Sequence, residues 1–344
     1  MVARLVLYRL SALLAFLPLG GCYVLQAAHG QYEVMRHSEP ISTVLADAET
    51  APATRASLEL VTAARAFAVA ELALPDSRSY RSYADLGRPY VVFNVVATAE
   101  FSVAPRRWCF PVAGCVAYRG YFDEQRARDY ALQRSIRGDD VSVGGVPTYS
   151  TLGHLPDPVF GSMLKWRETR LVGTIFHELA HERLYFTGDS EFNEAFASVV
   201  EEAGVRLWLE DAGRQAELDR VRLEAMREIE FSTLLRHTRD RLDELDRSGL
   251  DVAAMRIAKQ REFGLLKFDY EQLRRRWGGY AGYDAWFAQP LNNARLAAVA
   301  TYRDCMPGLQ RELDQAGSLP AFYDRVEALG RLSARQRHEQ VCQP

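Results

Sequence analysis

The chain has 344 residues, of which 48% are hydrophobic and 25% are charged, and its formal net charge is −3. This length and composition can bury one large core or two smaller ones, and they exclude an intrinsically disordered chain. Because acidic and basic residues are nearly balanced and no basic stripe occurs, the sequence also lacks the electrostatic footprint of a nucleic-acid-binding protein. We therefore expect a globular protein that binds no nucleic acid.

The first 21 residues are predicted to be a lipoprotein signal peptide. Arg4 and Arg9 give a positive start, an apolar stretch follows over residues 10–19, and small residues stand immediately before Cys22. This pattern resembles a bacterial lipoprotein signal, which is cleaved before a cysteine that becomes lipidated; an ordinary signal peptide with an incidental cysteine is the alternative. The apolar stretch is too short for a permanent transmembrane helix. Since Tyr23 rather than Asp follows the cysteine, we expect a lipid-anchored, periplasm-facing protein of the bacterial cell envelope, at the outer membrane.

Residues 22–54 are expected to form a tether with a first helix, and residues 55–344 a single domain. A helical pattern runs from Ser57 to Leu74 and ends at a Pro-Asp-Ser segment. Strand signals follow, because three segments are rich in β-branched and aromatic residues: 90–97, 112–122 and 141–150. They predict a small antiparallel sheet.

Four cysteines remain after Cys22, and an oxidising compartment would pair them. Cys109 and Cys115 flank a segment whose proline and glycine can close a tight loop, which leaves Cys305 and Cys342 for a second disulfide. The sequence alone permits three pairings, of which we favour this one. A zinc site made from these cysteines is disfavoured, because the only close pair is separated by more residues than a usual zinc knuckle.

The segment from His177 to His181 carries the motif His-Glu-Leu-Ala-His. Apolar residues recur at helical spacing from Arg167 to Phe186 without a proline, so the motif is predicted to lie on a buried helix. Residues four apart share a helix face, and both histidines can therefore bind one metal ion. Glu178 is then placed as the general base for a water activated by zinc. The alternative is that both histidines are helix-surface or core residues without a metal.

A second helix is predicted from Glu191 to Leu209, after a Gly-Asp-Ser break. Glu194, in its first turns, can complete a zinc site of two histidines and one carboxylate that keeps a position open for water. Glu201 is seven residues further on, shares the face of Glu194 and is the competing ligand. We favour Glu194 as the ligand, with Glu201 hydrogen-bonded to one of the metal-binding histidines.

Two neighbours of Glu194 are expected to support the site. Asn193 belongs to the Asn-Glu-Ala triplet around Glu194, which resembles the third-ligand segment of thermolysin-like zinc peptidases. Twelve residues separate Glu194 from His181, fewer than in those enzymes, whereas Glu201 would lie nearer their usual separation. Asp189 is a candidate to hydrogen-bond a zinc histidine, and the favoured alternative is that it orders the loop at the start of the helix. The metzincin pattern is excluded, because positions 184 and 187 lack its glycine and histidine.

Beyond residue 205 the chain is predicted to be almost wholly helical. Two long amphipathic segments, Glu210–Asp246 and Val252–Trp277, are joined near Ser248-Gly249, which predicts an antiparallel hairpin over residues 210–277. The expected fold class is therefore α+β and mainly helical. A small antiparallel sheet should pack beside the histidine helix, followed by the long hairpin and a C-terminal bundle.

Taken together, the motifs resemble those of a family of bacterial lipoproteins described as zinc-dependent aminopeptidases, a name that is itself inferred from the zinc motif. The resemblance covers most of the chain after residue 21, and one departure is His154-Leu155, where an aromatic pair is expected. The matching segments, besides the His177 motif, are Gly21-Cys22, Gly30-Gln31, Leu74-Pro75-Asp76, Trp108-Cys109-Phe110-Pro111, Tyr118-Arg119-Gly120-Tyr121-Phe122, Tyr149-Ser150-Thr151-Leu152-Gly153, and Asn292-Asn293-Ala294 to Tyr302.

A substrate cleft follows from the likeness to thermolysin-like peptidases, in which an edge strand just before the zinc helix binds the substrate backbone. Residues 147–153 occupy that place, so Tyr149, Ser150 and Thr151 are expected to line the cleft; a plain structural strand is the alternative. Tyr302 is expected to stabilise the oxyanion, with Tyr185 and Tyr149 as rivals.

The sequence thus predicts a zinc-dependent peptidase that hydrolyses peptides, with aminopeptidase action implied by the resemblance. The alternative is a membrane-tethered periplasmic scaffold or regulator with a non-catalytic zinc site. A structural zinc usually has four protein ligands, whereas this motif offers three and an additional base, which favours the enzyme.

Overall fold

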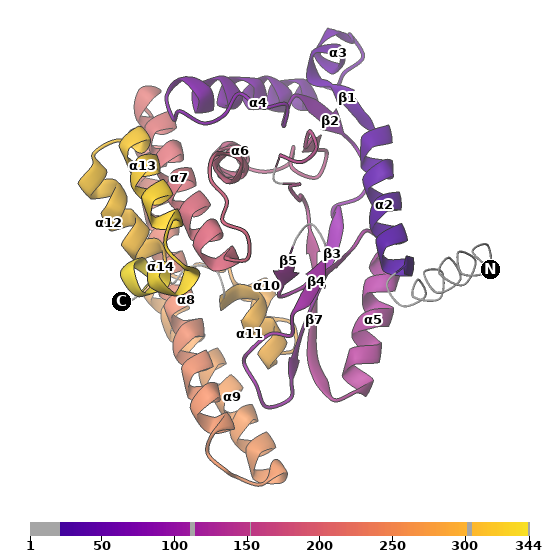
Figure 1. Ribbon diagram of the computed structural model, residues 1–344, viewed down its shortest axis with the longest axis vertical. Helices are drawn as coiled ribbons and strands as arrows, with labels where there is room; N and C mark the ends of the chain where they lie inside the picture. Colours follow the sequence, from indigo (N-terminus) through magenta and orange to yellow (C-terminus); the bar gives the residue numbers. More distant parts are fainter. Residues whose placement is uncertain (1–20, 111–113, 152, 301–304, 343–344) are drawn as a thin grey trace, which may run out of the picture.

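The computed structural model describes residues 21–110, 114–151, 153–300 and 305–342 (Figure 1). The expected signal peptide, residues 1–21, lies outside these residues except for its last residue, Gly21. Most of the described chain is helical, and its strands, most of them of two or three residues, form small sheets. The expected fold class, mainly helical α+β, is confirmed.

Two packed helices form the centre of the largest core. Helix α6 (Glu168–Arg183) and helix α7 (Ser190–Asp211) each bury a face of small and large apolar residues. Helix α4 (Pro52–Ala70) covers α6, and the C-terminal helices α12 (Met306–Ala316), α13 (Leu319–Gly330) and α14 (Ala334–Val341) lie beside α7 (Figure 1). Gly204 permits the close approach of the two central helices, since an added Cβ would lie 2.6 Å from the Phe176 ring.

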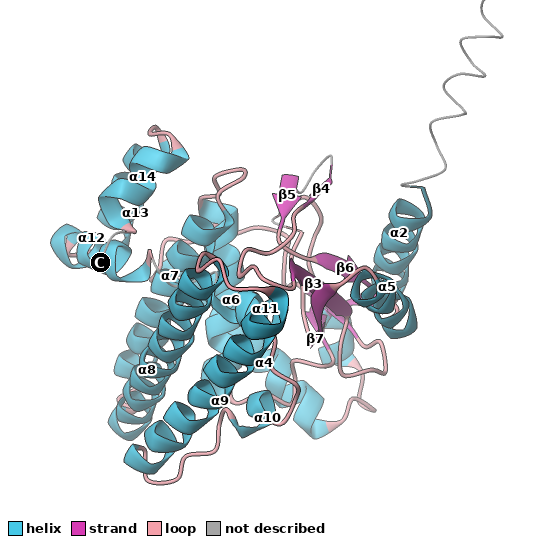
Figure 2. Ribbon diagram, turned by 90° about the horizontal axis from the view of Figure 1, so that it is seen from below, coloured by secondary structure: helices cyan, strands magenta, loops and turns pink. Residues whose placement is uncertain are grey.

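The central sheet lies on the other side of α6. Strand β3 (Val92–Ala99) pairs antiparallel with β6 (Arg119–Tyr121) and with β7 (Asp139–Val146). Because side chains alternate along a strand, Phe93 and Val95 face helix α5 (Glu124–Ile136), whereas Val96 faces helix α11 (Asn293–Ala300) on the opposite side (Figure 2). A hairpin of β4 (Trp108–Phe110) and β5 (Gly114–Val116) stands near the edge of this sheet, with Cys109 and Cys115 paired in register.

A further sheet has the order β1 (Ser38–Pro40), β2 (Ser82–Ala84), β8 (Val159–Phe160), and its β2–β8 pair is parallel. The sequence predicted a single sheet, because strands of two or three residues are too short to show alternation. The expected edge strand over residues 147–153 is also wrong: β7 ends at Val146, and residues 147–151 are irregular. Pro147 lacks the backbone donor that would continue the ladder.

The predicted helical hairpin is present as α8 (Gln215–Asp246) and α9 (Val252–Arg276), joined through Gly249 at a φ of +73° (Figure 2). The short helix α10 (Asp284–Phe287) packs against the aromatic side of this hairpin. No helix among the described residues is both long enough and apolar enough to span a membrane.

The N-terminal segment is more tightly packed than a tether. Helix α2 (Gly21–Arg36), in the region expected to be the first helix, lies against β6, where the Gln26 side chain bonds the backbone of Gly120 and Phe122. Gly30 gives room for this contact, since an added Cβ would lie 2.0 Å from the Phe122 ring. Strand β1 and helix α3 (Ile41–Ala46) then lead to α4.

Candidate metal centre

Helices α6 and α7 bring the candidate ligands together. His177 and His181 are one turn apart on α6, and His181 is only 4% exposed. The loop between the helices turns at Gly188, which has a φ of +85°, and α7 begins at the next residues. Glu194 therefore leaves the first turns of α7 towards the histidine face of α6, as the helix–loop–helix pattern predicted.

Three ligand atoms converge at this contact. The Nε2 atoms of His177 and His181 are 3.2 Å apart, and the Glu194 carboxylate lies 3.4 Å from the first and 3.8 Å from the second. Tetrahedral zinc with bonds of about 2.0–2.1 Å separates its ligand atoms by about 3.3–3.4 Å. The three side chains are thus spaced as ligands of one metal ion, and the residues present fit zinc.

Glu201 occupies a different position in the same site. Its Oε2 atom lies 3.0 Å from Nδ1 of His177, the ring nitrogen that faces away from the other ligand atoms. Gly173 leaves space for this carboxylate, since an added Cβ would come within 2.8 Å of its Oε1 atom. Of the two candidate carboxylates, Glu194 is therefore the one beside both Nε2 atoms, and Glu201 can orient His177.

The site carries an excess of negative groups. Burial opposes protonation of His177, but its hydrogen bonds to Glu194 and Glu201 outweigh burial and raise its pKa well above the usual value. Burial likewise opposes ionisation of Glu194, yet its bonds to the two histidines lower its pKa. Burial raises the pKa of Glu178, and the charges of His177 and His181 offset this only in part. A divalent cation would balance these carboxylates without requiring protonated histidines.

The surroundings of the His181 ring differ at its two nitrogen atoms. Within the described part of the chain, its buried Nδ1 atom has no hydrogen-bond partner. Its ring is held instead by packing, with the His177 ring centroid at 4.9 Å and the Tyr185 centroid at 6.2 Å. Nε2 is therefore the His181 nitrogen that can bind a metal ion between His177 and Glu194.

Of the three residues expected to line the cleft, Ser150 contacts the candidate site, whereas Tyr149 and Thr151 stabilise the loop that follows β7. The Ser150 hydroxyl lies 2.9 Å from Asp157 and is also hydrogen-bonded to Glu178. Thr151 gives its amide and hydroxyl to Asp157, and the Tyr149 phenol donates to Gln31 on α2. Ser150 is thus the member of the three that touches the proposed base.

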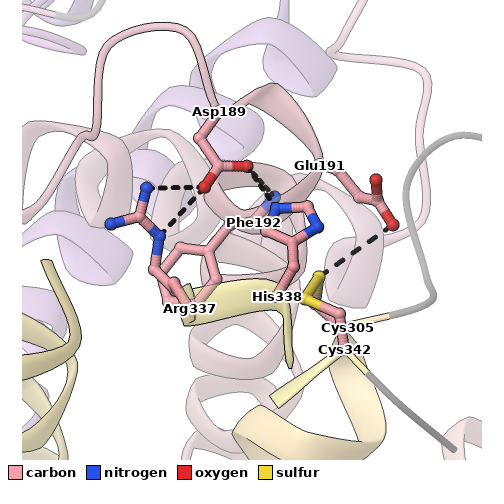
Figure 3. Close-up of a disulfide and its surroundings, with 7 residues drawn as sticks. All are labelled: Asp189, Glu191, Phe192, Cys305, Arg337, His338 and Cys342. Carbon is pink, nitrogen blue, oxygen red and sulfur yellow. Dashed lines mark hydrogen bonds and ion pairs between the residues drawn. A yellow bond between two sulfur atoms is a disulfide. The ribbon is translucent and has the colours of Figure 1, made fainter. Parts of the chain in front are cut away.

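Asp189 and Asn193 stabilise the loop before α7 and do not bond His177 or His181, so the expectation that they support a metal ligand directly is corrected. Asp189 accepts a bond from the Phe192 amide at the start of α7, two bonds from Arg337 at 2.9 and 2.6 Å, and one contact with His338 at 2.7 Å (Figure 3). The Asn193 side chain bonds both the N–H and the carbonyl of Phe186 at 2.8 Å. The helix-cap alternative for Asp189 is the observed one.

The C-terminal helix is tied to this network by a disulfide. Cys305, at the start of α12, is bonded to Cys342 at the end of α14, and Cys109 is bonded to Cys115. Cys305, His338 and Cys342 could also hold a metal ion, but the two sulfur atoms are bonded to each other in this structure. Figure 3 shows this disulfide beside the Asp189 network.

One tyrosine near the candidate site was not predicted from the sequence. Tyr118, between β5 and β6, is 36% exposed, and partial burial together with the charges of Glu194 and Glu178 raises its pKa to about 12. Tyr185 is 37% exposed and also lies near Glu194, while Tyr302 lies outside the described residues. No local spacing links Tyr118 to the histidine motif, because the sheet alone brings it there.

Comparison with protein families gives one match. A family described as "Putative aminopeptidase" matches residues 22–341, which include both central helices and the sheet. The chain belongs to this family. Its name supports a peptidase function for the chain. Searches of curated proteins and of solved structures found no match.

Proposed function

We propose that the protein is a zinc-dependent peptidase with His177, His181 and Glu194 as its metal ligands. The observation that carries this proposal is the convergence of their three ligand atoms within 4.8 Å of one another. The family name supports the reaction, and the fourth position, free of a protein ligand in the proposed set, suits hydrolysis better than a structural zinc site.

When bound, zinc would supply Lewis-acid chemistry, polarising the substrate carbonyl and lowering the pKa of water. Glu178 is adjacent to His177 in the chain but is not one of the three converging groups. It is the group we assign to take the proton from water and deliver it to the leaving amine. Ser150 would orient this carboxylate through its hydrogen bond.

Glu201 would hold the His177 ring in one orientation and one tautomer, since Nδ1 must donate to the carboxylate for Nε2 to bind metal. We assign the phenols of Tyr118 and Tyr185 as the donors to the oxyanion, because both lie near Glu194 and both remain protonated at neutral pH. Aminopeptidase rather than endopeptidase action is proposed from the family name.

We also propose that the mature protein is lipidated at Cys22 and faces the periplasm from the bacterial outer membrane. The support is the sequence before the cysteine, together with the position of Cys22 at the beginning of α2. Because α2 packs on β6 from Tyr23 onward, the domain would be held close to the membrane surface without a spacer.

Metal analysis of the purified protein, with digestion of a mixed peptide library read by mass spectrometry, tests the proposal. We expect one zinc per chain and cleavage of peptides from the amino end. His181→Ala should lose the zinc, whereas His154→Ala, a matched control outside the site, should keep it. A scaffold or regulator with a non-catalytic zinc would bind the metal and cleave no peptide.

A further inference from the structure

A pocket lies on the wall of the central sheet that faces α11. It has a volume of about 180 Å³, and its walls are the β3 and β7 surface, the β5–β6 connection and one side of α11. The residues of the sheet that line it include Asn94, Ser142 and Gly144, which alternate on the face opposite helix α5.

Gly144 accounts for much of this space. It pairs with Asn94 in the middle of the sheet, and an added Cβ would meet no atom within 4 Å. Its φ is outside the left-handed region, so the backbone does not require glycine there. Glycine inside a strand is otherwise unfavourable, and its occurrence marks places where another group approaches the backbone. The facing residues of α11 are also small, Ala297 and Ala298.

Two connections place this pocket next to the metal centre. Tyr118 lines the pocket, and its phenol is close enough to Glu194 and Glu178 to sense their charges. Strand β7 lines the pocket as far as Val146, and four residues later Ser150 is hydrogen-bonded to Glu178. These two connections, through Tyr118 in the pocket wall and through β7, are the basis for placing the pocket beside a substrate held at the metal centre.

The residues that line the pocket indicate which kind of substrate side chain can bind there. None of the described residues that line the pocket is charged, so an ionised side chain would lose its hydration without gaining a partner. A cavity of about 150 Å³ in another protein accepts benzene, which sets the size of a group that can fit. Val96 and Val146 supply apolar contacts.

We propose that this pocket is the specificity subsite of the peptidase and receives a neutral aliphatic or aromatic side chain of a residue flanking the scissile bond. The assignment rests on the proposed function, since it uses the metal centre to position the peptide. Gly144 is the specificity-determining residue, because its missing side chain leaves the space that the substrate fills.

Gly144→Val tests the assignment, because valine suits a strand and fills the pocket. Peptides that differ only in the residues flanking the cleaved bond would be compared, with glycine, alanine, leucine, phenylalanine, lysine and glutamate in turn. The parent should prefer leucine and phenylalanine. The variant should lose about tenfold or more of kcat/KM for these two and keep glycine and alanine peptides within about threefold, with zinc content unchanged.

Ala298→Leu fills the pocket from the opposite wall at an exposed helix position, and it should shift specificity in the same direction. Gly264→Ala, on α9, is the matched control, since a Cβ there also meets nothing within 4 Å. If both pocket variants keep the parent's preference, or if the parent prefers lysine or glutamate, the assignment is wrong.

A binding measurement separates this proposal from the proposed function. N-acetyl-phenylalaninamide and N-acetylglycinamide would be titrated by calorimetry into the parent and into Gly144→Val. Selective binding of the phenylalanine compound to the parent, lost in the variant, supports the pocket even if no peptide is hydrolysed. Equal binding of that compound to both proteins, or to neither, overturns the pocket whatever the activity.

Discussion

Replacing Arg337 with leucine should strongly destabilise the protein. Arg337 and Asp189 are 4% and 5% exposed, and the guanidinium donates two hydrogen bonds to one carboxylate oxygen. The same guanidinium stacks near the Phe186 and Phe192 rings, with centroid distances of 4.8 and 5.0 Å. Its removal leaves the Asp189 carboxylate buried, with the His338 ring as its remaining side-chain partner.

Removing one partner of a buried ion pair typically costs about 3–5 kcal/mol, because the other charge stays buried without compensation. Arg335 provides the matched control on the same helix. Its side chain is 87% exposed, and it pairs with Glu339 one turn away. An exposed pair of this kind contributes at most about 0.5 kcal/mol, so Arg335→Leu should be nearly neutral.

Guanidinium denaturation of the oxidised full chain would measure both effects as shifts in midpoint at an unchanged slope. A second consequence is local: Asp189 caps the first turn of α7, so Arg337→Leu should also weaken zinc binding through Glu194. If the two variants lose equal, small amounts of stability, or if Arg337→Leu alters neither property, the reasoning about this network is refuted.

Three further outcomes are expected. Glu201→Gln should weaken zinc affinity by about 10- to 100-fold, whereas Glu194→Gln should nearly empty the site, as metal titration would show; the reverse order would exchange their roles. Replacing Cys305 and Cys342, which close a loop of sequence separation 37, with serine should cost about 4 kcal/mol by the loop-entropy relation, and denaturation with an unshifted midpoint would contradict this. Cys22→Ala should move the protein from the membrane to a soluble periplasmic fraction or leave an uncleaved precursor, and unchanged mobility and fractionation would argue against lipidation.

The central helices were predictable because their signals are local. Helix α6 buries residues at regular helical spacing, and the cap of α7 follows directly from Gly188-Asp189-Ser190. By contrast, α5 was not predicted: it is strongly polar, and only Ala127 among its residues is buried. Its periodicity is therefore too weak to distinguish a helix from an exposed loop.

The site was predictable only where its residues are close in sequence. Two histidines one helical turn apart and a carboxylate on the next helix form a pattern that can be recognised from residue spacing alone. Tyr118 reaches the site through the sheet, and Arg337 meets Asp189 across 148 positions of sequence. Contacts of this kind depend on the packing of whole elements, which local spacing does not encode.

The most direct test of the account is peptide hydrolysis by Glu178→Gln protein with its zinc intact. Glu178 lies outside the three converging ligand atoms, so the variant should keep the parent's zinc content and fold. Loss of a general base should slow hydrolysis by about a hundred- to ten-thousand-fold. The account predicts this loss of rate at full zinc occupancy. A Glu178→Gln variant that hydrolyses peptides as fast as the parent, or a zinc-loaded parent that hydrolyses none, would contradict it.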